Sequence, residues 1–253
     1  MWKNLTVEEQ VEQLKEYLGC PCTYYPPSND FQLVDSDFYQ ARARGKKEGF
    51  VPMLIAVDEL LLECFELNGE DKTAEQVQQE LLDAPLKSGK ELLQGWLRGA
   101  KEGWAEVDPE FYASWDARVI GEVAGGEGIN RFLSPCDSTG RQVFPIVLAE
   151  IPVKHPWEVF AYLPFGGWNE CPPPEEQRAA AKYWFEQYGA VPAVMSMDIL
   201  EYALPAPVPW ERAMEAALEQ YFFCADIVDQ GVGTIGTLAD VLAKSKYWYF
   251  WWD

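Results

Sequence analysis

The sequence predicts an α+β fold in which helices pack on a mixed β-sheet. Two observations favour this class. Amphipathic helical patterns are interspersed with short apolar runs of strand length, and the chain ends in an unbroken run of aromatic residues, 247–252. A chain of 253 residues can bury roughly 70–75% of its unfolded surface, which is enough for a substantial core. One large domain or two small ones are both compatible with this length.

The terminal aromatic run is too short to span a bilayer, which takes about 20 apolar residues. Aromatic side chains suit a pleated surface, so the run predicts a β-strand. Alternation divides its side chains between two faces, with Tyr247, Tyr249 and Trp251 on one and Trp248, Phe250 and Trp252 on the other. Because both faces are apolar, we expect this strand to be central and covered on both sides. The alternative is an exposed aromatic platform for sugars or a protein partner.

The first 105 residues are expected to form an N-terminal region of helices with one or two strands. Helix starts are marked by capping boxes at Thr6 and Thr73 and by Asp58. Apolar periodicity predicts further elements: a helix ending near residue 18, a short strand at 31–34, a helix over 36–47, a buried strand over 50–57 and a helix over 92–100. Residues 106–144 are expected to connect two halves, with one strand candidate at 118–123.

The remaining residues, 145–253, carry clearer signals. A hairpin of two strands, 146–151 and 157–163, is expected around the turn residues between them. Helices are predicted over 174–188, ended by Gly189, and from Pro209 to about residue 222. The other predicted elements are strands at 191–197 and 199–204, a helix over 234–244 and the terminal strand. Residues 49–60 and 189–200 resemble each other, each with a Gly that ends a helix, a strand and a turn at Asp.

Charge narrows the range of partners. The chain has 41 acidic and 20 basic side chains, a net charge of −21. That charge repels phosphate backbones and anionic membranes, so we expect no nucleic acid and no membrane as partner. A cation or a basic protein is favoured, although maintaining solubility is the simpler role for the same charge.

The cysteines and the first residues indicate a cytoplasmic protein. Residues 1–6 contain no apolar signal core, and no transmembrane segment follows. Six cysteines in such a compartment are expected to be free thiols. Cys20 and Cys22 lack the spacing of a metal knuckle and the chain has a single histidine, so we expect no metal site and no cofactor.

Several motifs in the second half resemble the bacterial family called domain of unknown function 4253. They are Gly167-Trp168-Asn169-Glu170-Cys171-Pro172, Tyr183-Trp184 with Tyr188-Gly189-Ala190, Asp198 with Leu200-Glu201, Glu219-Gln220-Tyr221 with Cys224 and Asp226 to Gly231, and the aromatic terminus. The resemblance covers about residues 145–253, and Ala225 stands where the family pattern has Pro. It implies a shared fold and a bacterial source, and it carries no catalytic residue across.

Known catalytic patterns do not fit. Cys171 and the only histidine, His155, are predicted to lie at opposite ends of the expected strand 157–163, and no nucleophile-elbow motif is present. The glycines at 231, 233 and 236 satisfy a dinucleotide pattern but lack the preceding strand. We therefore expect no catalytic residue and a non-catalytic role.

Two loops combine the groups that a binding site needs. Trp168, Asn169 and Glu170 offer stacking surface, hydrogen bonds and charge, while Asp226, Asp229 and Glu201 are candidates for a carboxylate cluster. The simpler interpretation is that these residues cap helices and hold backbone amides. We expect an acidic binding module that neutralises a basic partner such as a toxin. The alternative is an enzyme or a small-ligand-binding protein that uses the same two loops.

Overall fold

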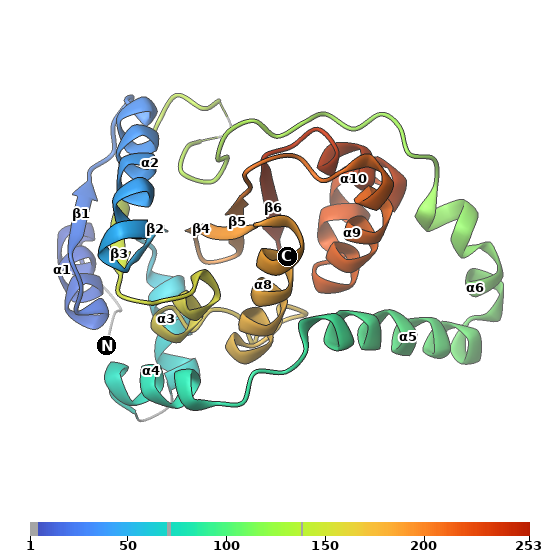
Figure 1. Cartoon of the computed structure of the whole chain (residues 1–253), viewed down its shortest axis with the longest axis horizontal. Helices are drawn as coiled ribbons and strands as arrows, with labels where there is room; N and C mark the ends of the chain where they lie inside the picture. Colours follow the sequence, from blue (N-terminus) through green and yellow to red (C-terminus); the bar gives the residue numbers. More distant parts are fainter. Residues whose placement is uncertain (1–4, 70–71, 138) are drawn as a thin grey trace.

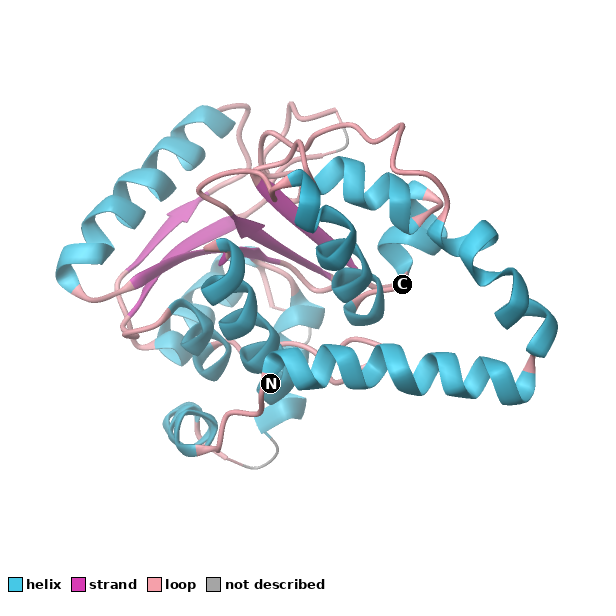
Figure 2. Ribbon diagram, turned by 45° about the vertical axis from the view of Figure 1, so that its right-hand side comes forward, coloured by secondary structure: helices cyan, strands magenta, loops and turns pink. Residues whose placement is uncertain are grey.

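A computed structural model describes residues 5–69, 72–137 and 139–253. Most of the segment examined for an apolar leader, residues 1–4, lies outside the described residues. The α+β prediction is confirmed: within the described residues, six strands form one mixed sheet with helices against both faces (Figures 1 and 2). No helix in the same ranges combines the length and apolar character needed to cross a bilayer.

The sheet has the order β1-β3-β2-β4-β5-β6. Its strands are β1 (Cys22–Tyr25), β2 (Val51–Ala56), β3 (Ile146–Ile151), β4 (Val191–Met195), β5 (Ile199–Ala203) and β6 (Tyr247–Trp251). The two middle strands, β2 and β4, run parallel with Leu54 opposite Val194, whereas the other neighbours are antiparallel. The sheet therefore takes its middle pair from sequence regions that are about 140 residues apart.

Most helices bury their apolar sides in one core that also contains Met53 and Ile55 of β2. These helices are α1 (Val7–Leu18), α3 (Glu59–Gly69), α5 (Gly89–Val107), α7 (Val159–Tyr162), α8 (Pro174–Tyr188), α9 (Trp210–Phe223) and α10 (Ile235–Leu242). Leu54 points into a second core, formed by α2 (Phe31–Glu48) and residues 132–143. The sheet is thus covered on both faces, as the continuous apolar pattern of β2 predicts.

The remaining helical elements lie between β2 and β4 in the chain, apart from one turn near the carboxyl end. They are α4 (Ala74–Asp83), α6 (Pro109–Trp115), the π-helical turns η1 (Asp116–Ile120) and η3 (Ile227–Val232), and the 3-10 turn η2 (Pro156–Glu158). Figure 1 shows α5 running along one edge of the molecule, with α6 at its far end. From there residues 121–137 and 139–145 return across the sheet to β3.

The terminal strand forms as predicted, but its expected central position was wrong. β6 lies at the edge of the sheet and pairs with β5 alone. Its faces alternate as expected: Trp248 and Phe250 are fully buried, while the side chains on the other face are half-buried. Apolar residues on both faces report what lies above and below a strand, and they carry no information about hydrogen-bonding neighbours beside it.

The alternative of an exposed aromatic platform is not favoured by the burial of these rings. Trp252 is buried, and Trp251 is half-buried with its indole N–H donated to Asp198 Oδ2 at 3.1 Å.

Two predicted strands are helical. Residues 31–34 form the first turn of α2, because Asp30 accepts the Leu33 amide and caps the helix. Residues 157–162 belong to η2 and α7, because Glu158 accepts the amide of His155 at 2.9 Å and Pro156 starts the turn. The expected hairpin therefore does not exist, and β3 pairs with β1 and β2 instead.

Two smaller expectations also change. The strand candidate at 118–123 is replaced by the π-helical turn η1 and irregular chain. β1 was not predicted, because Pro21 and Pro26 lie on either side of this four-residue strand and are more typical of a loop. All six cysteines lie within the described residues and form no disulfide.

The helix ends predicted from capping boxes and glycines are confirmed, whereas α2 (Phe31–Glu48) and α5 (Gly89–Val107) are longer than the predicted helices over 36–47 and 92–100. Thr6 and Thr73 form complete capping boxes, and Gly49 and Gly189 end α2 and α8 in the left-handed conformation. The two similar segments, 49–60 and 189–200, contain the parallel neighbours β2 and β4. The helices before them pack in different cores, α2 in the second and α8 in the first.

Candidate functional site

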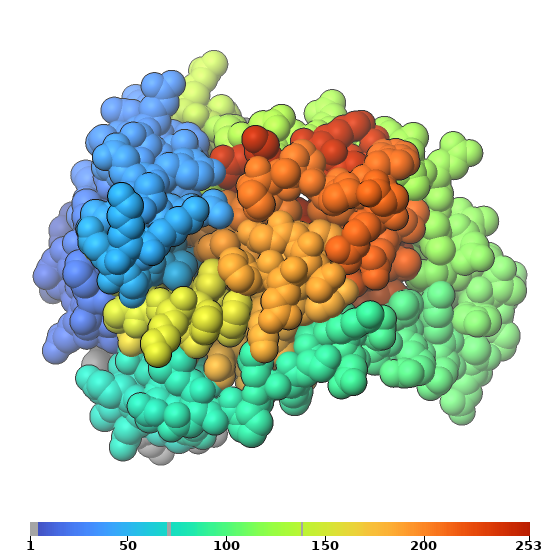
Figure 3. All heavy atoms as spheres, viewed as in Figure 1, coloured from blue at the N-terminus to red at the C-terminus, as the bar shows by residue number. Residues whose placement is uncertain are grey.

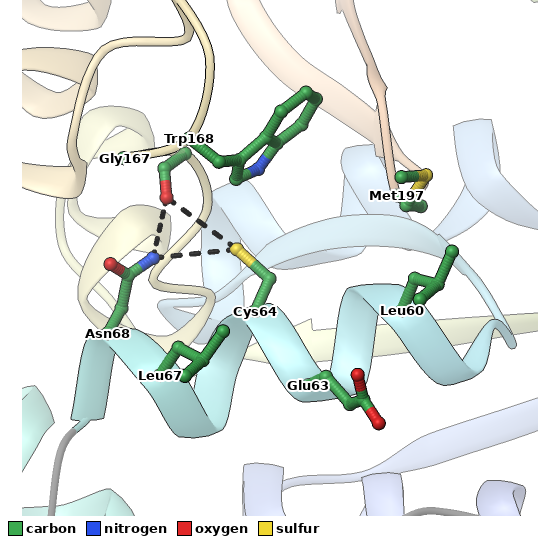
Figure 4. Close-up of a pocket in the computed structure, with 9 residues that line it drawn as sticks. Leu60, Glu63, Cys64, Leu67, Asn68, Gly167, Trp168 and Met197 are labelled. Atoms are coloured by element: carbon green, nitrogen blue, oxygen red, sulfur yellow. Dashed lines mark hydrogen bonds between the residues drawn. The ribbon is translucent and has the colours of Figure 1, made fainter.

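A pocket of about 210 Å³ lies beyond the carboxyl ends of the parallel pair β2 and β4 (Figure 4). Ligand sites in sheets with parallel strands are commonly found at this end. One wall belongs to α3 and the other to the loop before α8 and the end of β4. We call it the α3–Trp168 pocket, and its lining residues are Leu60, Glu63, Cys64, Leu67, Asn68, Gly166, Gly167, Trp168 and Met197.

The α3 wall exposes apolar side chains. Asp58 begins this helix by accepting the amides of Leu60 and Leu61 at its Oδ1. The inner side of α3 is buried in the core, but Leu60 is 52% exposed and Leu67 is 79% exposed. Because these two leucines are seven residues apart, they lie on one side of the helix. Figure 4 shows Trp168 and Met197 facing this side from across the pocket.

The opposite wall is a tight loop whose backbone conformation restricts which residues can occupy it. Gly166, Gly167 and Asn169 have positive φ of 96°, 83° and 47°, and Asn169 is the only described non-glycine residue with a positive φ. A Cβ on Gly166 would lie 1.9 Å from the Pro172 carbonyl oxygen, so no larger residue fits. The Gly167 amide donates to the Cys171 carbonyl and closes the loop. Such strain is retained mostly where a fixed side-chain position matters, here that of Trp168.

Hydrogen bonds tie the two walls together. The Asn68 side-chain amide donates to the carbonyl oxygens of Pro164 and Gly166, both at 2.7 Å. The Cys64 thiol lies 3.6 Å from the same Gly166 oxygen. The pocket is therefore preformed by contacts between α3 and the loop.

The thiols around the pocket are not suited to nucleophilic chemistry. Burial raises the pKa of the Cys64 and Cys171 thiols, and it raises the pKa of Cys224 to about 12. A thiol with a raised pKa has little thiolate at neutral pH. The histidine considered as a base stacks on Trp157 with ring centroids 4.5 Å apart, whereas Cys171 is buried beside Gln177. This arrangement gives no Cys–His pair.

A group of carboxylates lies at the other side of the same loop. We call Glu170, Asp226, Asp229 and Asp253 the C-terminal acidic cluster. Burial raises the pKa of Asp229, and the charges of Asp226 and Glu170 raise it further. The Tyr221 hydroxyl lies 3.4 Å from Asp229 Oδ2. In the described ranges none of these carboxylates is ion-paired with Lys or Arg, so their negative charge is uncompensated.

The chain terminus joins the loop to the carboxylates. Asn169 donates its side-chain amide to the Asp253 carbonyl at 2.8 Å, and Asp226 Oδ2 accepts the Asp253 amide at 3.0 Å. Asp226 directly precedes η3 and its Oδ1 accepts the Gln230 side-chain amide, and Asp229 lies within this π-helical turn. Single π turns occur frequently at functional sites. Among the described residues, no set of three His, Cys, Asp or Glu side chains is arranged to hold a metal ion.

Replacing Asn169 with glycine is expected to loosen the terminus. Glycine keeps the positive φ but removes the bond to Asp253, which is worth about 1 kcal/mol. Amide hydrogen exchange at Trp252 and Asp253 should accelerate about fivefold. Asn130→Gly removes a comparable exposed amide bond, to Gly128, and should leave these exchange rates unchanged. Equal exchange rates in both variants would show that Asn169 does not restrain Asp253.

Glu201 occupies a different place from the other predicted site residues. It is fully buried on β5 and accepts the amides of Leu133 and Ser134 and the Ser134 hydroxyl. It therefore holds the connecting segment against the sheet. The structure brings together five of the six candidates, Trp168, Asn169, Glu170, Asp226 and Asp229, whereas the side chain of Glu201 contacts residues 133 and 134 instead.

Sequence reasoning missed the α3 wall. Leu60, Leu67 and Met197 have the same character as core residues, so their exposure cannot be deduced from their type. The available signal was the Leu60–Leu67 spacing on the side of α3 opposite Leu61, Leu62 and Phe65. A helix with apolar residues on both sides is expected to be buried or to meet a partner.

The fold and site define an α+β protein with a mixed sheet and a preformed apolar pocket beside uncompensated carboxylates. Residues 147–253 match the family model described as domain of unknown function (DUF4253), so the C-terminal part of the chain is a DUF4253 domain, as the motifs predict. Comparisons with curated proteins and with solved structures found no match. The matched residues supply Trp168, Met197 and the acidic cluster, whereas α3 precedes them. The pocket is thus formed jointly by the family domain and the residues before it.

Proposed function

We propose that this protein is a non-catalytic binding module for a basic protein segment. The segment would place an apolar side chain in the α3–Trp168 pocket and basic side chains on the C-terminal acidic cluster. The observation that carries this proposal is that one strained loop, 166–171, forms a wall of the pocket and also carries Glu170 of the cluster.

The size of the pocket supports a side-chain anchor. Its volume of about 210 Å³ is below the roughly 300–1,000 Å³ typical of small-molecule sites. Protein interfaces commonly depend on one or two anchors that enter such pockets. Leu60 and Leu67 extend the apolar surface at the rim, where a partner would cover them.

The charge supports a basic partner. Glu170, Asp226, Asp229 and Asp253 add negative charge at one site of a chain whose net charge is already −21. Complementary charges accelerate association and select partners of opposite sign. Because exposed charges are screened by salt, this contribution should weaken between low and physiological ionic strength.

The alternative of carboxylate catalysis has less support. It needs Glu201 in one cleft with the two loops, but Glu201 is engaged by the amides of the connecting segment. The neighbouring thiols have raised pKa values, which also favours a binding role. Non-catalytic binding therefore fits the contacts of Glu201 and the raised thiol pKa values better than carboxylate catalysis does.

Leu67→Asp is expected to weaken partner binding at least tenfold, because it places a charge at the apolar rim of the pocket. Proteins retained by the immobilised wild type would be identified by mass spectrometry, and the dissociation constant of the purified basic partner measured. Leu33→Asp is the matched control, since Leu33 is an exposed leucine, 49% exposed, on α2. It should change affinity less than twofold.

The charge contribution is tested separately with Glu170→Gln and Asp229→Asn. Both should weaken binding more at 50 mM than at 300 mM salt, with a lower association rate. An equal loss in the Leu67 and Leu33 variants would refute the location of the site. Retention of acidic or neutral partners only, or a turnover dependent on Asp229, would refute the function.

A further inference from the structure

A second pocket, of about 460 Å³, lies at the opposite, amino ends of β2 and β4. Its walls come from the end of α2, the start of β2, the residues after β3, and the junction of α8 with β4. Figure 3 shows these segments meeting on one face of the molecule, with residues near 50 in blue, those near 155 in yellow and α8 in orange. We call it the amino-end pocket.

The two similar sequence segments create this pocket. Gly49 and Gly189 end α2 and α8 with φ of 84° and 69°, and the chain then turns directly into β2 and β4. Because the two strands are parallel neighbours, both helix-to-strand turns lie at the same end of the sheet. A hollow remains between them, with Phe50, Phe185 and Pro205 among its apolar lining.

The charge of the amino-end pocket is opposite to that of the protein. Three of the fourteen described residues that line it are cationic, Arg42, Lys46 and Lys154, and none is acidic. Acidic residues outnumber basic ones by two to one in the whole chain. A random sample of this surface would therefore be expected to contain more acids than bases.

These three cations also lack carboxylate partners. Within the described part of the chain, Arg42, Lys46 and Lys154 are among the cations without an ion pair; the ion-paired ones are Lys15, Arg44, Lys72, Lys87, Lys182, Arg212 and Lys244. Arg42 is half-buried, and burial lowers the pKa of its guanidinium. A desolvated charge without a counterion is unfavourable, and a bound anion would remove that cost.

We infer that the amino-end pocket binds a small organic anion, with an apolar body of ring size and one carboxylate, phosphate or sulfonate group. The apolar lining would take the body, and Arg42, Lys46 and Lys154 would take the charged group. The volume lies within the roughly 300–1,000 Å³ range of small-molecule sites. This site is independent of the α3–Trp168 pocket, which lies at the other ends of the same strands.

The test uses a matched pair of fluorescent probes. 8-Anilinonaphthalene-1-sulfonate has an apolar ring system with one negative charge, and N-phenyl-1-naphthylamine has the same rings without it. Lys46→Met and Lys154→Met should each raise the dissociation constant of the sulfonate about three- to tenfold, and leave that of the neutral probe unchanged. Competition with 1-naphthoate and 1-naphthyl phosphate then distinguishes carboxylate from phosphate preference.

Lys47→Met is the control, because Lys47 is the next residue of α2 and does not line the pocket. It should change sulfonate affinity less than 1.5-fold. Equal effects of the Lys46 and Lys47 substitutions would overturn the proposal, as would equal affinity of the wild type for both probes. Lys154 lies outside any helix, so its substitution cannot weaken α2. The Lys154→Met result therefore still tests the proposal if the Lys46 substitution destabilises that helix.

Discussion

Phe250→Ala is expected to lower the free energy of unfolding by about 3–5 kcal/mol, because it empties a fully buried aromatic site. Phe250 stacks on Trp184 at 5.4 Å and contacts Phe223 at 5.0 Å and Tyr202 at 5.7 Å between ring centroids. These rings come from α8, α9 and β5, which are rigid neighbours with little freedom to close the cavity. The loss is measured by urea denaturation at constant pH.

Tyr249→Ala is the control for this prediction, because it lies on the same strand with its side chain on the half-buried face. It removes a ring of similar size with fewer buried contacts, so the expected loss is about 1–2 kcal/mol. Similar losses in the two variants would contradict the assignment of faces in β6. A Phe250→Ala variant that unfolds like the wild type would contradict the role of β6 in the core.

Glu201 is expected to make the folded state less stable as the pH rises from 5 to 8. Burial raises its pKa from 4.5 to about 7, although the donors from Leu133 and Ser134 partly oppose the rise. Between these two values the folded state binds the proton more strongly than the unfolded chain, so stability is lost as the pH increases. Each unit of pKa is worth about 1.4 kcal/mol, and the full loss is about 3 kcal/mol.

Glu201→Gln should remove most of this loss, since glutamine has nearly the same shape and does not ionise. The unfolding midpoint in urea, measured at pH 5, 6, 7 and 8, should vary less in this variant than in the wild type. Glu16→Gln, on the exposed side of α1, should keep the wild-type dependence. An identical pH dependence in all three proteins would show that Glu201 does not titrate in this range.

Local chemistry explains which parts of the fold were predictable. Helix boundaries followed from residues that act on adjacent backbone, such as Thr6, Thr73 and Gly189. The strand predictions at 31–34 and 157–163 were wrong because a short apolar run suits a strand or a buried helix equally well. Their caps, Asp30 and Glu158, distinguish the two outcomes and could have been identified from the sequence.

The site was predictable only in part, for a related reason. The loop at 166–171 stands out because adjacent glycines, Trp, Asn and Glu are an unusual combination, and the structure places it at a pocket. The position of Glu201 depends on residues 133 and 134, which lie 68 and 67 positions away in the chain. Such long-range pairings, like the edge position of β6, are decided by tertiary packing, and no local pattern encodes them.

The edge position of β6 has a consequence for self-association. An uncharged aromatic strand without proline, at the edge of a sheet, is the kind of segment on which further chains add to form aggregates. Asp253 and Asp226 lie at the end of this strand, so copies that added to the edge in parallel and in register would bring like charges together. The acidic cluster thus disfavours this parallel stacking of β6. A basic partner that neutralised it would also have to shield the strand beside it, or the complex would be prone to precipitate.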